Sequence, residues 1–228
     1  MKKKQFAVIG LGTFGYNVAC ELGKQGLSVL AIDNDEEPTS RISQFVTQSV
    51  IADATDDKAM EDLGLGDCDC AVIAVGEIET SILAILIAKD LGIKNIIVKC
   101  LSNWHSKIAV KLGASQVIYP ELEMAKKLVA NLISPNILEH IELSKDYSIV
   151  EILAPAKYRN KAIKDTDIRS EFGANIIAIK RKVPVINKDG QSDIKEEIMM
   201  VPGPNYEIKQ NDVLVTVGRT DMMEKLKG

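Results

Sequence analysis

Three glycines near the start of the chain have the spacing of a phosphate-binding loop. Gly10, Gly12 and Gly15 form a Gly-x-Gly-x-x-Gly pattern directly after the apolar residues 5–9. In such a loop the first glycine lets the chain turn sharply off a strand, the second lets the backbone approach a pyrophosphate, and the third lets the next helix pack on the sheet. The predicted helix, from residue 14 to about 26, would point its N-terminal N–H groups at the anion.

An acidic residue follows at the position expected to meet a ribose. Residues 28–32 predict a second apolar strand, and Asp33 comes directly after it, 18 positions beyond Gly15. A carboxylate there accepts hydrogen bonds from ribose hydroxyls and repels a 2′-phosphate, so the predicted ligand is NAD or an adenine nucleotide rather than NADP. The alternative, a simple glycine turn with Asp33 capping the next helix, is less favoured because strand, glycines and acid occur in register.

Four further apolar runs predict more strands of the same sheet. They are near-continuous, as in parallel strands that are covered on both faces, and they occupy residues 50–52, 71–75, 95–98 and 116–119. With helices between them, the six strands predict an α/β fold, a doubly wound parallel Rossmann-like sheet over residues 1–120. A ligand should lie across the carboxyl ends of the strands, where Asp53, Gly76 and Lys99 fall. Lys99 is interpreted equally well as a phosphate contact or as a solvated strand-end lysine.

Composition limits the remaining classes. A chain of 228 residues with 46% hydrophobic residues can bury a large core and predicts two domains. The net charge of −4 and the lack of a large basic face argue against a nucleic-acid binder. The basic start, residues 1–4, is followed by no signal-peptide apolar region, and the longest apolar run, residues 82–88, is far shorter than the roughly 20 residues of a membrane span.

The cysteines and histidines suggest no metal or redox chemistry. Four cysteines without a pairing pattern predict reduced core residues of a cytosolic protein: Cys20, Cys68, Cys70 and Cys100. The two histidines, His105 and His140, lie far apart with no carboxylates at ligand spacing, so we expect no zinc site. We interpret His105 as a solvated residue at a helix start rather than as one that borders the ligand crevice.

One predicted helix has too much apolar surface for a sheet to cover. The helix at about residues 79–91 is apolar nearly all round, and a sheet covers one side. We expect its other side to meet a second subunit; the alternative is an ordinary buried helix of a doubly wound fold.

The pattern changes after residue 120. Helical spacing over residues 121–132 and again over 136–143 predicts a helix-turn-helix at 121–144. Shorter units then predict a small α+β domain at 145–228, with strands at 148–153, 175–181, 198–201 and 213–217, a helix at about 165–172, a polar loop around Asp189 and Gly190, and a terminal helix from Thr220.

In this order, these segments resemble the RCK (KTN) regulatory subunits of bacterial Trk- and Ktr-type potassium uptake systems, the KtrA-type group above all. The resemblance covers essentially the whole chain and is carried by residues 9–15, 31–34, 52–55, 97–99, 119–121, 147–151 and 173–180. It implies a nucleotide-binding N-lobe, a crossover helix-turn-helix that intertwines two subunits, and a dimerising C-lobe (RCK_C, TrkA_C-like). It also implies a cytoplasmic octameric ring docked beneath a membrane-embedded potassium-translocating subunit, with ligand-controlled gating rather than catalysis.

The resemblance also implies the residues around the nucleotide, which would be ATP or ADP. They are Gly10, Leu11, Gly12, Thr13, Phe14, Gly15, Asp33, Asn34, Asp53, Ala54, Thr55, Val75, Gly76, Lys99 and Glu121. By resemblance, Glu121 is a candidate ligand for a divalent cation, Mg²⁺ or Ca²⁺, that bridges nucleotides at the dimer interface; the alternative is a carboxylate stabilised by the helix dipole. KtrA-type sequences usually carry at position 13 an arginine that senses the terminal phosphate, whereas this chain has Thr13, so the means of distinguishing ATP from ADP stays open.

A second ligand is implied for the C-terminal domain. KtrA-type proteins are associated with cyclic di-AMP, and a two-fold symmetric ligand suits an interface between two identical domains. By resemblance its site would comprise Ile163, Ile168, Arg169, Asn175, Ile176 and Ile177. The alternative is that these isoleucines belong to the domain core and to a dimer contact, with Arg169 a solvated helix residue.

Two other functions use the same fold. A nicotinamide-dependent oxidoreductase would need a proton donor near the nicotinamide and a substrate domain, and the chain has no histidine after His140 and no obvious constellation for this task. A Trk-type subunit that senses NAD has a similar architecture, and the glycine loop with Asp33 fits it as well.

Overall fold

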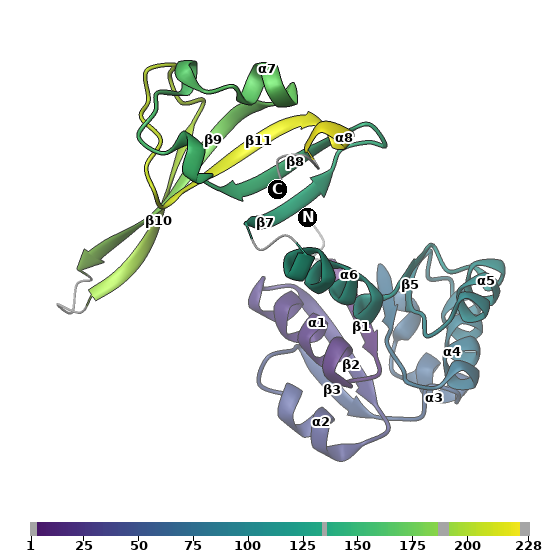
Figure 1. Ribbon diagram of the computed structural model, residues 1–228. Coiled ribbons are helices and arrows are strands. Elements are labelled where there is room, and N and C mark those ends of the chain that lie inside the picture. The colour runs from purple at the N-terminus through teal and green to yellow at the C-terminus, as the bar shows by residue number, and fades with distance from the viewer. Residues whose placement is uncertain (1–3, 134–135, 187–191, 224–228) are drawn as a thin grey trace. The chain divides into compact units, whose positions relative to one another are not determined.

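A computed structural model describes residues 4–133, 136–186 and 192–223. The chain divides into two compact units, Met1–Met124 and Ala125–Gly228. Each unit contains its own sheet and its own core (Figure 1).

The first unit is built on a six-stranded parallel sheet with the order β3-β2-β1-β4-β5-β6. Its strands are β1 (Gln5–Ile9), β2 (Ser28–Asp33), β3 (Gln48–Ile51), β4 (Cys70–Ile73), β5 (Asn95–Lys99) and β6 (Gln116–Ile118). All six predicted strands are therefore confirmed, as is the doubly wound sheet. The order reverses between β1 and β4, which is the switch point where ligands bind in such folds.

Helices cover both faces of this sheet (Figure 1). They are α1 (Thr13–Lys24), α2 (Glu36–Ile42), α3 (Asp57–Asp62), the 3₁₀ turn η1 (Leu65–Asp67), α4 (Ile78–Asp90) and α5 (Asn103–Leu112). A longer helix, α6 (Pro120–Ile133), begins in the first unit and ends in the second.

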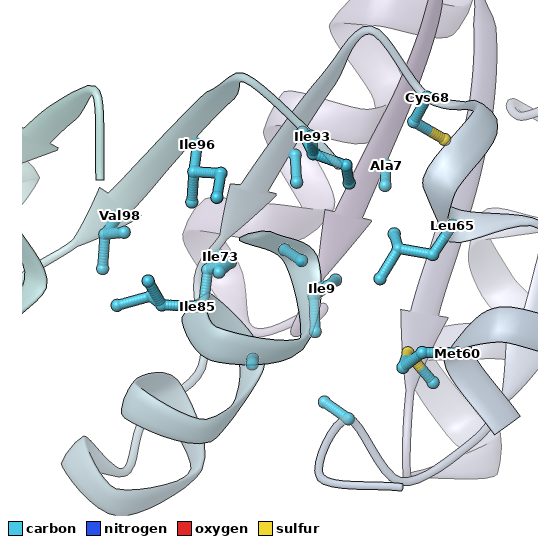
Figure 2. Packing of buried hydrophobic residues seen from close by; sticks show 14 of the residues in the cluster. Ala7, Ile9, Met60, Leu65, Cys68, Ile73, Ile85, Ile93, Ile96 and Val98 are labelled. Atoms are coloured by element: carbon cyan, nitrogen blue, oxygen red, sulfur yellow. The ribbon is translucent and has the colours of Figure 1, made fainter. Parts of the chain in front are cut away.

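Alternate residues of the strands enter two different cores, which explains the continuous apolar runs. Ile9 of β1 belongs to the cluster that α3, α4 and α5 cover, where it lies near Met60, Ile73 and Ile85 (Figure 2). Val8, one residue earlier, belongs to the cluster on the side of α1 and α2. Neither face of β1, β2 or β4 is solvated, so these three strands show no polar alternation.

The four cysteines are buried and free of disulfides, as expected for core residues. Burial raises the pKa of the Cys68 thiol to about 11, with the neighbouring Asp67 adding to the effect. At neutral pH this thiol is protonated and therefore a poor nucleophile.

Helix α4 presents apolar side chains both to the core and to solvent. Ala84, Ile85 and Ala88 are buried, whereas Leu83 is 40% exposed. Leu83, and Ile78 at the start of the helix (39% exposed), are thus suited to contact another molecule, while Ile85 belongs to the core of its own unit.

The second unit contains a five-stranded antiparallel sheet with the order β10-β9-β11-β8-β7. Its strands are β7 (Ile137–Glu142), β8 (Tyr147–Leu153), β9 (Asn175–Ile186), β10 (Ser192–Met200) and β11 (Asp212–Arg219). Short helical segments cover one face: η2 (Ala156–Tyr158), η3 (Ile163–Asp165), α7 (Ile168–Phe172) and α8 (Thr220–Met223). The core between them includes Val150, Ile152, Phe172, Ile179 and Leu214.

The helix predicted at residues 136–143 is wrong, and the helix-turn-helix with it, because this segment is strand β7. Its apolar residues Ile137, Leu138 and Ile141 have helical spacing, which misled the sequence interpretation. In the structure the segment pairs antiparallel with β8 along its whole length. Without β7, the backbone groups on that side of β8 would have no ladder partner, so tertiary pairing overrides the local preference.

Two other elements differ in extent from the prediction. Strand β10 begins at Ser192 instead of residue 198, because its polar residues 193, 195, 196 and 197 hid the strand pattern. The helix predicted at about 165–172 is limited to α7, with η3 before it. The predicted polar loop at Asp189 and Gly190 lies outside the described residues. Within the described ranges, no helix combines the length and hydropathy that a membrane crossing needs.

Candidate functional site

A pocket of about 340 Å³ opens at the carboxyl ends of the parallel strands, beside the switch point between β1 and β4. This volume lies within the usual range for small-molecule sites. The loops after five strands line it, with Ile9, Gly10, Gly12, Thr13, Phe14, Ile32, Asp33, Asn34, Ala52, Asp53, Ala54, Ala74, Val75, Gly76, Glu77, Thr80 and Lys99.

The three loop glycines have distinct structural roles. Gly10 has φ +89°, and a Cβ there would lie 2.8 Å from the backbone nitrogen of Val75. A Cβ on Gly15 would overlap the carbonyl oxygen of Gly10, so this glycine lets α1 approach β1. Gly12 is different, because a Cβ on it would meet no protein atom within 4 Å. Gly12 therefore leaves space for something other than the protein's own chain.

The N-terminus of α1 faces the same loop. Gly12 is the N-cap and provides no side-chain hydrogen bond, so the first N–H groups of this 12-residue helix receive no cap. Such N–H groups, together with the helix dipole, attract a phosphate or another anion.

Asp33 connects the second strand to the glycine loop. One oxygen of its carboxylate, Oδ2, accepts the N–H of Leu11, and the other, Oδ1, accepts the N–H of Asp35 at 3.0 Å. Each carboxylate oxygen has a further lone pair, so the group can still accept hydrogen bonds from two vicinal hydroxyls. The sequence pattern predicts Asp33 at this place, whereas its bond to Leu11 is seen only in the structure.

Asp53 is held as an anion at the tip of β3. Its Oδ1 accepts the N–H of Thr55 at 2.9 Å and the Thr55 hydroxyl at 2.7 Å. These two hydrogen bonds lower the pKa of Asp53. Thr55 thus orients Asp53 without lining the pocket itself.

Lys99, at the end of β5, is the cation among the pocket residues. Its Nζ lies 2.6 Å from Oε1 of Glu121, in the first turn of α6. The Lys99 side chain is 15% exposed and the Glu121 side chain 68% exposed. The hydrogen bond from Lys99 lowers the pKa of Glu121. Lys99 is therefore a largely covered, paired cation rather than a freely solvated one.

The pocket also contains two polar residues that the sequence interpretation missed. Glu77 is the N-cap of α4, and its Oε2 accepts the Thr80 hydroxyl at 3.2 Å. Their position after β4, next to the predicted Gly76, was the available signal. With Asp33, Asp53 and Glu77 facing one lysine, the lining carries an excess of negative charge.

Of the residues named from the sequence, four lie beside the pocket without lining it: Leu11, Gly15, Thr55 and Glu121. Each contacts a lining residue, as described above. The structure thus brings the predicted nucleotide residues together in one region of the first unit.

The residues named for a cyclic dinucleotide lie in the second unit in two different environments. Arg169 and Asn175 are exposed, whereas Ile168 is 2% exposed and belongs to the core. Ile163 and Ile176 pack against that core, and Ile177 is half-buried.

His105 is buried, so its interpretation as a solvated residue is wrong. It is 1% exposed and lies between α4 and α5, where its Nε2 is 3.1 Å from the Ser81 hydroxyl. Its Nδ1 accepts the N–H of Leu101 at 3.3 Å, and burial lowers its pKa. In the described residues, no group of three or more potential ligand side chains is placed to hold a metal ion.

The strand order 3-2-1-4-5-6, with a glycine loop and an acid at the switch point, defines a Rossmann-type nucleotide-binding fold joined to a second α+β unit. Family models match both parts: the TrkA-N domain matches residues 6–120 and the TrkA-C domain matches residues 147–227. The chain belongs to the Trk- and Ktr-type (RCK) family, which confirms the resemblance seen in the sequence.

Two curated relatives span nearly the whole chain. Ktr system potassium uptake protein C of Bacillus subtilis is 38% identical over 95% of this chain and 92% of its own length. Ktr system potassium uptake protein A of the same organism is 38% identical over 96% of this chain and 93% of its own length.

Among solved structures, the GsuK channel has the same fold at low identity. It superposes with a TM-score of 0.65 at 15% identity, over 99% of this chain and 39% of the channel chain. The GsuK channel bound to NAD superposes with a TM-score of 0.53 at 18% identity, over 99% of this chain and 38% of that chain.

Proposed function

We propose that this protein is a cytoplasmic regulatory subunit of a potassium uptake system, which gates a membrane-embedded potassium-translocating subunit in response to ATP or ADP. The observation that carries the proposal is the pocket at the switch point, where the open side of Gly12, the uncapped start of α1, Asp33 and Lys99 converge. The family membership supplies the transport role, since the two Bacillus relatives are potassium uptake proteins.

The proposed nucleotide lies across the carboxyl ends of the strands. Its phosphates face the N–H groups at Gly12 and Thr13, near Gly76 and Lys99. Its ribose hydroxyls donate to Asp33, and its adenine lies near Ala54, between Asp53 and Thr55. The remaining predicted residues, Gly10, Leu11, Phe14, Gly15, Asn34 and Val75, shape the loop around it. Because Asp33 is a carboxylate, a 2′-phosphate is disfavoured and NADP is a poor ligand.

The proposed gating step uses the pair Lys99–Glu121. A phosphate that approaches Lys99 competes with Glu121 for the same ammonium group. Glu121 is in the first turn of α6, the helix that leads into the second unit. Nucleotides with different numbers of phosphates then differ in how strongly they displace Glu121, in the first turn of α6, from Lys99. Such a difference is needed for regulation, because a ligand that binds two states equally shifts neither.

Glu121 is also the proposed ligand of a divalent cation, Mg²⁺ or Ca²⁺. One carboxylate supplies a small part of the six or more oxygen ligands that such ions take. Nucleotide phosphates and a second copy of the chain would have to supply the others. This role requires Glu121 to leave Lys99, which the phosphate would then neutralise.

We further propose the organisation that the family resemblance implies. Residues 1–120 form the nucleotide-binding domain, 121–144 the connection, and 145–228 the regulatory dimerisation domain. Copies assemble into dimers and an octameric ring, and the protein binds no nucleic acid. The exposed Leu83 of α4 is a candidate contact in this assembly.

NAD is the second candidate ligand. The GsuK channel, which has the same fold, has been solved bound to NAD. The acidic lining and Asp33 suit the adenosine half of NAD as well as that of ATP. We propose no catalysis: His105, the histidine of the first unit, is buried against Ser81 and does not line the pocket, so it is not placed to act on a nicotinamide.

Cyclic di-AMP is the proposed second regulator. Arg169 and Asn175 are exposed and available for phosphate and base contacts, whereas Ile168 would act by shaping the core beneath them. Equilibrium dialysis of the intact protein should show one cyclic di-AMP per dimer, with binding lost in Arg169→Ala. Binding that is the same in Arg169→Ala would remove this assignment.

The gating proposal is tested by ion flux. The protein is combined with a potassium-translocating membrane subunit of its own system in proteoliposomes, and potassium flux is measured with ATP, ADP or no nucleotide. We expect flux to depend on the nucleotide only when the protein is present. Flux that is independent of the nucleotide, or unchanged when the protein is omitted, would overturn the proposed function.

A further inference from the structure

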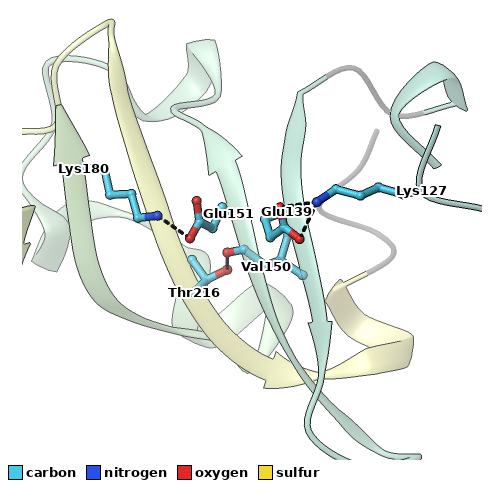
Figure 3. Close-up of polar contacts among 6 residues, drawn as sticks. All are labelled: Lys127, Glu139, Val150, Glu151, Lys180 and Thr216. Carbon is cyan, nitrogen blue, oxygen red and sulfur yellow. Dashed lines mark hydrogen bonds and ion pairs between the residues drawn. The ribbon is translucent and has the colours of Figure 1, made fainter. Parts of the chain in front are cut away.

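The antiparallel sheet of the second unit has two edges that differ in how well they are protected. Edge strand β7 is short, has a register shift between Ile137 and Glu139, and contacts α6 through the ion pair of Lys127 with Glu139 (Figure 3). Edge strand β10 has nine residues, no proline and no register shift in its pairing with β9. The charges of β10, Asp193, Lys195, Glu196 and Glu197, would repel many incoming strands, but they are of both signs. A long regular edge of this kind is a template for a strand whose charges complement it.

The hydrogen-bonding direction of β10 follows from two observations. The N–H of Val201 donates to the carbonyl of Ile177 at 2.9 Å, and these residues continue the β9–β10 register. Because bonded and non-bonded pairs alternate, the odd-numbered residues of β10 bond to β9 and the even-numbered ones direct their N–H and C=O groups to the open edge. Pro184 agrees with this assignment, since it lies opposite Ile194 and has no N–H to donate.

The side chains at this edge form a pattern that is complementary to itself. Ile194 is 67% exposed and Ile198 is 54% exposed, and both are even-numbered and so share one face of the strand. Lys195 and Glu197 are exposed and share the other face. On one side of Glu196 the chain has Lys195 and then Ile194, and on the other side it has Glu197 and then Ile198. The two charges are opposite in sign.

We infer that β10 of one copy pairs antiparallel with β10 of a second copy, around a two-fold axis at Glu196. In this register Ile194 lies opposite Ile198 of the second copy, and Lys195 lies opposite Glu197 of the second copy. This axis is a second one, separate from that of the proposed cyclic di-AMP site, because Ile177 lies opposite Val201, beyond the end of β10. Like any two-fold axis it produces each contact twice. Apolar and opposite-charge pairs directly across two antiparallel strands are both stabilising.

Neighbouring registers lose this complementarity. An axis at Lys195 places Ile194 opposite Glu196, and an axis at Glu197 places Ile198 opposite Glu196. In the inferred register the two Glu196 carboxylates lie opposite each other, but Lys182 lies directly across from Glu196 within its own hairpin. Lys182 offsets part of their repulsion. The pairing joins the two antiparallel sheets into one continuous sheet.

This inference deepens the assembly part of the proposed function, and it does not depend on the nucleotide pocket. It is tested with Glu196→Cys in the intact protein. Across a hydrogen-bonded antiparallel pair the Cα atoms are about 5.5 Å apart, which suits a disulfide. The native cysteines are all buried, so the new thiol is the accessible one in the described residues. Mild oxidation and non-reducing gel electrophoresis should show mostly covalent dimer.

The matched control is Lys182→Cys. Lys182 is exposed and lies on β9, directly across from Glu196 and on the same face of the sheet. Two such thiols would lie roughly 14 Å apart, at three strand spacings, and should not cross-link. Adding Ile194→Lys to Glu196→Cys should abolish the dimer while circular dichroism stays unchanged. A Glu196→Cys protein that stays monomeric on the gel would overturn the inference, as would equal cross-linking of Lys182→Cys. In either case nucleotide binding would still report separately on the proposed function.

Discussion

Lys99 and Glu121 connect the sheet that forms the pocket to the helix that leaves the first unit, with 2.6 Å between Nζ of the lysine and Oε1 of the glutamate. Lys99 is at the end of β5 and also lines the pocket. Glu121 is exposed and does not line it. The same ammonium group therefore contacts the candidate phosphate site and the first turn of α6.

We predict that substitutions of Glu121 and of Lys99 have opposite effects on the affinity for ATP. Glu121→Gln weakens the competitor for Lys99, and with divalent cations chelated it should tighten ATP binding about two- to fivefold, the value of an ion pair whose carboxylate is solvent-exposed. Lys99→Met should weaken ATP binding and leave adenosine binding unchanged, because adenosine has no phosphate. Isothermal titration calorimetry measures both.

The control is Glu21→Gln, which breaks an ion pair of the same length, 2.6 Å to Lys24, on α1 but away from the pocket. It should leave nucleotide affinity unchanged. Lys99→Met with the ATP affinity of the wild type would show that Lys99 takes no part in phosphate binding.

Substitutions of two loop glycines should affect ligand binding and protein stability separately. A Cβ on Gly12 meets no protein atom within 4 Å, and its φ of −59° is open to alanine, so Gly12→Ala should keep the wild-type stability. The added methyl group occupies ligand space, and we expect nucleotide affinity to fall at least about tenfold, or about 1.4 kcal/mol. Gly15→Ala would overlap Gly10 and should lose about 1–3 kcal/mol of stability.

Thermal unfolding with and without nucleotide distinguishes the two variants. Gly12→Ala should unfold at the wild-type temperature without ligand and gain less stability from saturating ATP than the wild type, by about 1.4 kcal/mol or more. If Gly12→Ala instead gained as much as the wild type, the glycine loop would not be the phosphate site.

His105 should make stability depend on pH. Burial lowers its pKa below the ordinary value of 6.5, so the unfolded state takes up a proton at a higher pH than the folded state. Stability contributed by the neutral imidazole is present above pH 6.5 and is lost as the pH falls below it, by up to about 1.4 kcal/mol per pH unit. His105→Gln should flatten the pH dependence of urea unfolding between pH 7.5 and 5. Identical slopes in both proteins would contradict this account.

Helix α4 allows a test of assembly. Leu83 is 40% exposed, so Leu83→Glu should change the unfolding free energy of a single unit by less than about 0.5 kcal/mol. If α4 contributes to the ring, this variant should reduce the mass measured by light scattering. Ile85→Glu places a charge in the core and should prevent folding, which makes it unsuitable for the same purpose. An unchanged mass for Leu83→Glu would exclude this face of α4 from the assembly.

The sequence was most predictive where local pattern and tertiary environment agree. Strands β1, β2 and β4 could be predicted because both their faces are buried, which leaves continuous apolar runs such as residues 6–9 and 29–32. The glycine loop could be predicted because only glycine fits at Gly10 and Gly15. Asp33 could be placed because it ends β2, the strand that pairs with β1 before the glycine loop.

The predictions from the sequence failed where contacts between residues far apart in the chain determine the structure. Strand β7 has helical spacing and becomes a strand because β8 needs a partner. Strand β10 is mostly polar because it lies at an edge, so no alternation marks it. His105 is buried because α4 provides Ser81 as its hydrogen-bond partner, 24 positions away in the chain. Glu77 enters the pocket as the N-cap of α4, and its place next to Gly76 was the one local signal for it.

The central claim, that the pocket binds an adenine nucleotide through its ribose and phosphates, is tested most directly by calorimetric titration of Asp33→Ala with ATP, ADP and NAD. Loss of hydrogen bonds to a charged acceptor should cost about 1–3 kcal/mol of binding energy, or roughly 5- to 150-fold in affinity, for each ligand that the wild type binds. The matched control is Asp69→Ala, whose carboxylate likewise accepts a backbone N–H, that of Gln5, but lies outside the pocket. We predict weakened binding in folded Asp33→Ala and unchanged binding in Asp69→Ala. Wild-type affinity in a folded Asp33→Ala protein would contradict the claim.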